Sequence, residues 1–214
     1  QGYRVGIVDL TDGEPTPMCP EPAVRLAEAA EAARALGVPH RVTLDLSNRR
    51  LFDDFDARVA LARVLRLWRP RVVIGFGGKT PLASPDHWQA AQITDAAVFY
   101  SRLTRWEEHF GDLPPHQISS QLYFKLDFDP HPFGPTMTHF VVDIGDTLEQ
   151  KMSSLHCYRS QFPPSKEPFL RRCRSGALHV GAMAGYEAGE MFVLGRTLGT
   201  GDLMKLLFGG GESP

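Results

Sequence analysis

The sequence predicts an α/β protein with a Rossmann-like, mostly parallel sheet that is flanked by helices and followed by a C-terminal extension. Strand-like and helix-like stretches alternate over residues 3–76, at the spacing that right-handed crossovers between parallel strands require. The first strand-like run, residues 3–10 (YRVGIVDL), is mostly apolar and β-branched. Such a run is typical of a strand buried within a parallel sheet.

Residue preferences support each element in the first half of the chain. Alanine, glutamate and arginine favour the first helix, and Gly37 ends it. Asp53 and Asp54 suit the positive end of the second helix dipole, and Arg69-Pro70 ends that helix. The predicted elements are a strand over 3–10, a helix over 22–36, a strand over 40–46, a helix over 53–68 and a strand over 72–76.

The second half predicts a less regular order of elements. These are a helix over 87–103, strands over 117–128 and 139–144 with a loop over 129–136 between them, and helices over 145–161 and 167–186. We expect one domain over residues 1–208. Residues 209–214 (GGGESP) are expected to form a flexible tail.

Composition excludes several classes of function. The 214 residues carry a net charge of −2, which gives no electrostatic basis for binding nucleic acid or an anionic membrane. No apolar run is long enough to span a bilayer. The three cysteines are far apart and form no CxxC pair, which favours a reducing compartment and predicts a cytoplasmic protein.

Two polar clusters follow predicted strands, where open parallel sheets bind their ligands. Residues 11–14 (TDGE) follow the first strand, and residues 77–87 follow the strand over 72–76. Both clusters could face one crevice. Asp12 and Glu14 could equally be turn residues, and Arg25 could be a surface arginine of the first helix.

The segment Ser84-Pro85-Asp86-His87 has both a structural and a functional interpretation. Ser84 can cap a helix, Pro85 fits its first turn, and Asp86 suits the helix dipole. This interpretation does not explain His87. The sequence contains no HExxH, paired HxH, GxGxxG, phosphate loop or GxSxG, so spacing alone defines neither a complete zinc site nor a nucleotide site.

The order of segments resembles the PIG-L/LmbE-like de-N-acetylases, and most closely the branch that deacetylates N-acetylglucosaminyl malate for bacillithiol. The resemblance covers at least residues 2–162. It is carried by GYRVGIVDLTDGE, RLAEAAEAARALGV, RPRVVIGF, SPDHWQAAQITDAAVF, FVVDI and KMSSLHCYRSQF. It implies a Rossmann-like zinc hydrolase that removes an acetyl group from a small acetylated amino sugar. It also implies assembly into homo-oligomers.

The resemblance assigns expected roles to particular residues. His87 matches the metal-binding histidine of the family's HPDH motif, and Asp86 and Ser84 occupy its catalytic positions. Ser84 replaces a histidine, and a serine hydroxyl cannot carry a proton near pH 7 as an imidazolium can. Arg25, Glu14 and Asp12 are expected on the substrate side.

The family's AHPDD motif, which holds further metal ligands, does not occur in the sequence. We therefore expect that the natural protein has an additional N-terminal portion. A catalytically degenerate family member that acts as a binding or scaffolding protein is the main alternative. A third alternative is an unrelated sugar- or nucleotide-binding α/β domain, against which the lack of a phosphate loop counts.

Overall fold

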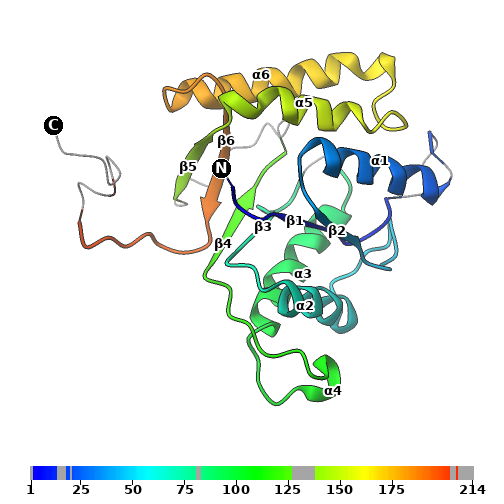
Figure 1. Cartoon of the computed structure of the whole chain (residues 1–214), viewed down its shortest axis with the longest axis vertical. Helices are drawn as coiled ribbons and strands as arrows, with labels where there is room; N and C mark the ends of the chain where they lie inside the picture. Colours follow the sequence, from blue (N-terminus) through cyan, green and yellow to red (C-terminus); the bar gives the residue numbers. More distant parts are fainter. Residues whose placement is uncertain are drawn as a thin grey trace.

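The computed structural model describes residues 2–13, 18–19, 21–80, 83–126, 138–202 and 206 (Figure 1). Strands and helices are mixed along the chain, and the predicted α/β class is confirmed. The strands are β1 (Gly6–Asp9), β2 (His40–Thr43), β3 (Val72–Phe76), β4 (Ser120–Phe124), β5 (His139–Asp143) and β6 (Gly189–Leu194). The helices are α1 (Pro22–Ala35), α2 (Phe55–Trp68), α3 (Asp86–Tyr100), α4 (Glu107–Phe110), α5 (Leu148–His156) and α6 (Glu167–Met183), with short 3₁₀ turns at Gly145–Thr147 and Pro164–Lys166.

The sheet is less parallel than the sequence predicts. β1 pairs parallel with β2, and β3 pairs parallel with β4. β6 was not predicted, and it runs antiparallel to both β4 and β5 in the order β3-β4-β6-β5. The chain reverses after α6 at Gly185, whose φ of 79° suits glycine, and β6 therefore runs back along that helix.

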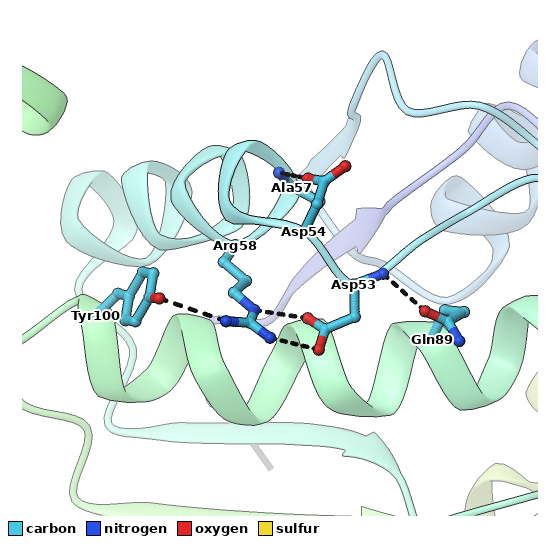
Figure 2. A network of polar contacts seen from close by, with 6 residues as sticks. All are labelled: Asp53, Asp54, Ala57, Arg58, Gln89 and Tyr100. Atoms are coloured by element: carbon cyan, nitrogen blue, oxygen red, sulfur yellow. Dashed lines mark hydrogen bonds and ion pairs between the residues drawn. The ribbon is translucent and has the colours of Figure 1, made fainter.

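Helices lie on both sides of the strands (Figure 1). On one side α2 packs against α3, and the core between them contains Leu61, Leu65 and Ile93. On the other side α5 contacts both α1 and α6, and Met152 and Leu170 are buried there. Asp54 caps α2 by accepting a hydrogen bond from the Ala57 N–H at 2.9 Å (Figure 2).

Among the described residues, β1–β2 and β3-β4-β6-β5 are separate ladders. Val72 and Ile74 of β3 are 47% and 51% exposed. The additional N-terminal portion that we expect from the sequence stays a prediction. The predicted loop over 129–136 and the whole predicted tail over 209–214 also lie outside the described residues. No described helix combines the length and the apolar character needed to cross a membrane.

Gly181 of α6 allows this helix to lie directly against the start of β6. A Cβ atom at Gly181 would lie 2.5 Å from the backbone C and Cα atoms of Ala188. We expect Gly181→Ala to lower the free energy of unfolding by about 1–3 kcal/mol, because backbone must move to admit the methyl group. Denaturant unfolding measures this loss. Gly199→Ala is the matched control, since no atom lies within 4 Å there. Equal stability of the two variants would contradict the close packing.

Candidate functional site

A cavity of about 360 Å³ lies at the carboxyl ends of β1 and β3. Asp12, Arg25, Asp86 and His87, four of the site residues predicted from the sequence, all line it. Ser84 is exposed and is not among the lining residues, and Glu14 lies outside the described residues. The two polar clusters that follow β1 and β3 therefore do face one crevice, as the sequence predicts. The remaining lining residues are Val8, Asp9, Leu10, Thr11, Gly13, Leu26, Ala29, Arg41, Thr43, Leu51, Phe76 and Ala90.

His87 is held in place in the first turn of α3. Its ring stacks on Phe76, with centroids 4.6 Å apart and planes 14° from parallel. Its Nδ1 lies 2.9 Å from Thr80 Oγ1. When the hydroxyl oxygen accepts from Nδ1–H, Nε2 keeps its lone pair and can act as a metal ligand or a base. Burial lowers the pKa of His87, and the nearby Asp86 carboxylate only partly opposes this shift.

The lowered pKa of His87 predicts a pH dependence of stability. Between the lowered pKa and the ordinary value of 6.5, the unfolded chain binds more protons at this residue than the folded chain. His87 therefore makes the folded state more stable as the pH rises across that window. Above pH 6.5 its contribution to the free energy of unfolding no longer changes with pH. An NMR titration of the ring in chelator-treated protein should give a midpoint below 6.5. A midpoint at or above 6.5 would contradict the desolvation of His87.

Asp86 and Ser84 both contribute to local structure. The expectation that Ser84 caps the helix and that Pro85 lies in its first turn is wrong, because Pro85 is itself the N-cap of α3 and no side chain caps the helix. Ser84 lies one residue earlier, and its Oγ accepts a hydrogen bond from the Asp86 N–H at 3.3 Å. Asp86 Oδ2 accepts a hydrogen bond from the Arg49 N–H at 2.6 Å. Both residues therefore make hydrogen bonds at the start of α3. The catalytic roles of Asp86 and Ser84 stay predictions.

Tyr158 contacts two arginines of the cavity wall, Arg41 and Arg25. Arg41 pairs with both carboxylate oxygens of Asp9, at 2.6 and 2.8 Å, and donates to the Tyr158 hydroxyl at 2.9 Å. The guanidinium group of Arg25 lies over the Tyr158 ring, 4.6 Å from its centroid. Burial alone would lower the pKa of Arg41, but its hydrogen bonds to Asp9 and Tyr158 raise it, so this side chain stays charged.

Sequence reasoning did not assign Arg41 or Asp9 to the site. The segment over 158–162 (YRSQF) brings Tyr158 to the two arginines and also packs against α1. The Ser160 N–H and hydroxyl both donate to the buried Glu28 carboxylate, at 2.7 and 2.6 Å. The sequence did contain one sign of Arg41. A charged side chain is unusual within a predicted strand of a buried sheet, and Arg41 lies in the strand over 40–46.

The loop between β2 and α2 forms another wall of the cavity through Leu51. Two hydrogen bonds attach it to α3. One joins Arg49 to Asp86, and the other runs from the Asp53 N–H to Gln89 Oε1 at 2.7 Å (Figure 2). Arg58 pairs with both oxygens of Asp53, at 2.7 and 2.6 Å, and fixes the end of this loop.

The side chains available as metal ligands show how far the described residues fit the expected zinc ion. In the part of the chain that the structure describes, no group of three or more His, Cys, Asp or Glu side chains could hold a metal ion. His87 has the chemistry of a zinc ligand, because Thr80 contacts its Nδ1 and leaves Nε2 available to bind a metal. The described residues therefore fit one position of a zinc site and do not complete the site.

Comparisons with known proteins agree with the resemblance seen in the sequence. A family model described as PIG-L, GlcNAc-PI de-N-acetylase, matches residues 1–98. A diacetylchitobiose deacetylase from Thermococcus kodakarensis is 31% identical over 200 residues, which cover 89% of this chain and 70% of the relative.

Two solved structures share both fold and sequence with this chain. The conserved protein TT1542 from Thermus thermophilus superposes with a TM-score of 0.78 at 29% identity, over 93% of this chain and 84% of that chain. The N,N'-diacetylchitobiose deacetylase from Pyrococcus horikoshii, solved with an inhibitor, gives a TM-score of 0.72 at 27% identity. That match covers 88% of this chain and 72% of the other.

Proposed function

Because this chain belongs to the PIG-L family of de-N-acetylases, we propose that it hydrolyses the N-acetyl group of a small glucosamine-containing molecule, with N-acetylglucosaminyl malate as the model substrate. The observation that carries the proposal is the position of His87. It shares one cavity with Asp12, Arg25 and Asp86, at the carboxyl ends of the strands. Relatives named as diacetylchitobiose deacetylases support an acetylated amino sugar as the substrate class.

The proposed cofactor is zinc, and His87 would hold it through Nε2. When bound, zinc polarises the amide carbonyl and favours attack by water. Thr80 and Phe76 orient the imidazole, and burial lowers its pKa, which favours the neutral form that binds a metal. Around His87 the described residues offer no group of three or more His, Cys, Asp or Glu side chains that would complete the proposed site.

The remaining side chains of the cavity would bind and orient the substrate. A volume of about 360 Å³ suits one sugar ring with a substituent. Arg25 would pair with a carboxylate or hydroxyl of the substrate, and Asp12 would accept from a sugar hydroxyl. The resemblance would also make the Ser84 hydroxyl a donor to the developing oxyanion, where the loss of one donor costs about 10²–10³ in rate, although Ser84 is exposed and does not line the cavity.

Two further properties form part of the proposal. The cysteines that the structure describes, Cys19, Cys157 and Cys173, are all free thiols, which supports a reducing, cytoplasmic location. Homo-oligomerisation is proposed from the family resemblance. Size-exclusion chromatography with light scattering tests it directly.

A binding protein without catalysis is the second candidate function. Ser84 in place of the family histidine favours this candidate, because a hydroxyl is a weaker acid than an imidazolium. The incomplete donor group around His87 in the described structure also favours it. Such a protein would bind an acetylated amino sugar in the same cavity and release it unchanged.

Measurement of released amine distinguishes the two candidate functions. Protein made from its native gene, supplied with zinc, is incubated with N,N'-diacetylchitobiose, N-acetylglucosaminyl malate and, as a control, an N-acetylated amino acid. The proposal predicts new primary amine from a glucosamine compound and none from the control. Calorimetric binding of the sugars without any amine release would reject the hydrolase in favour of the binding protein.

A further inference from the structure

We propose that Asp86 is a positioning residue, which holds the 47–54 loop against α3 through the backbone of Arg49 and thereby shapes the cavity wall beside His87. The proposal rests on the proposed function for its effect on turnover. The attachment of the loop to α3 rests on hydrogen bonds alone and does not depend on the proposed function. It gives Asp86 a role different from the direct catalytic role that the resemblance implies.

Arg49 has a backbone conformation that needs compensation. Its φ is 62°, in the left-handed region, where a Cβ atom crowds the following carbonyl oxygen. Residues other than glycine adopt this conformation when surrounding contacts enforce it. Here the Arg49 N–H donates to Asp86 Oδ2 at 2.6 Å, and a hydrogen bond to a carboxylate is a strong one. The Arg49 side chain is exposed, and the hydrogen bond to α3 is made by its backbone.

A second attachment lies four residues further along the loop. The Asp53 N–H donates to Gln89 Oε1 at 2.7 Å (Figure 2). Asp86 and Gln89 are three residues apart on α3 and so lie on neighbouring turns of one helix face. The loop is therefore attached to α3 at two points, one on each side of Leu51.

Leu51 connects these attachments to the cavity. It is 7% exposed, packs in the core with α2 and α3, and lines the cavity together with Asp86 and His87. If the Arg49 attachment is lost, the wall at Leu51 is free to shift while Thr80 and Phe76 still hold the His87 ring. Removal of the Asp86 carboxylate should therefore weaken substrate binding more than it slows the chemical step.

Four variants test the role of Asp86 in turnover. Asp86→Ala should raise KM about tenfold with a much smaller change in kcat, whereas Asp86→Asn keeps an acceptor oxygen for the Arg49 N–H and should have a KM clearly lower than that of Asp86→Ala. Arg49→Gly alone should also stay near wild type, because glycine adopts a positive φ readily. The double variant Asp86→Ala/Arg49→Gly should recover most of the lost KM. A double variant as impaired as Asp86→Ala would overturn the proposal, since a lost catalytic group cannot be restored by glycine at position 49.

Amide hydrogen exchange gives a readout that is independent of activity. The Arg49 N–H should be protected in the wild type and in Asp86→Asn, and it should exchange at least about tenfold faster in Asp86→Ala. Unchanged protection in Asp86→Ala would overturn the proposal even in an active enzyme. If no substrate is deacetylated but exchange responds as expected, the proposed function fails and the positioning of the loop by Asp86 stands.

Discussion

His87→Ala is expected to lower kcat/KM for de-N-acetylation by more than about 100-fold. Substitution of residues that merely orient a metal ligand costs about 10–100-fold in related sites, so loss of the ligand itself should cost more. Alanine also removes the ring that stacks on Phe76 at 4.6 Å and contacts Thr80. Steady-state kinetics of amine release measures the effect.

His156→Ala is the matched control for this experiment. His156 ends α5, its Nδ1 lies 2.8 Å from the Met152 carbonyl oxygen, and it does not line the cavity. This variant should retain activity within about threefold of the wild type, as expected of a substitution away from the reacting groups. Comparable activity of His87→Ala and His156→Ala would show that His87 has no part in the reaction.

Arg66→Ala is expected to lower the free energy of unfolding by about 3–5 kcal/mol, because a buried carbonyl group that loses its donor costs about 1–3 kcal/mol and the side chain serves three of them. Arg66 is 3% exposed, and its guanidinium group lies 3.6 Å from the centroid of the Phe110 ring. It donates to the carbonyl oxygens of Leu113, Leu103 and Tyr100. Removal of this one side chain leaves all three carbonyl groups without that donor. Denaturant unfolding followed by circular dichroism gives the loss.

Arg63→Ala provides the comparison on the same helix. Arg63 lies one turn before Arg66, is exposed, and donates to a single carbonyl oxygen, that of His109. Its removal should change stability by about 0.5 kcal/mol or less, as is usual at the surface. Arg66→Lys should recover little, because an ammonium group cannot reach three carbonyl oxygens in the fixed geometry of a guanidinium group. Equal losses for Arg63→Ala and Arg66→Ala would refute the role of the buried network.

Local sequence patterns predicted most of the elements, because apolar periodicity and helix-ending residues act over a few positions. β3 has the predicted bounds, and β5 (His139–Asp143) ends one residue before its predicted end. β6 could not be predicted in this way. Its place between β4 and β5 depends on the reversal at Gly185 and on the close approach of Gly181 to Ala188. Both are tertiary effects.

The candidate site shows the same division between local and distant contacts. His87 and Asp86 stand out because they follow a strand and begin a helix, and Asp12 lies in the turn after another strand. The roles of Arg41 and Tyr158 depend on a hydrogen bond between residues 117 positions apart, which no local pattern encodes. The hydrogen bond between Arg49 and Asp86 is likewise created by the fold, because a left-handed arginine has no sequence signature.

Zinc content, measured by elemental analysis of the protein made from its native gene, tests the central claim most directly. The proposed site predicts one zinc ion per chain in the wild type and in His156→Ala, and its loss in His87→Ala. Zinc retained by His87→Ala would remove this histidine from the metal site. Absence of zinc from all three proteins would contradict the hydrolase proposal and leave the binding protein as the better account of the cavity.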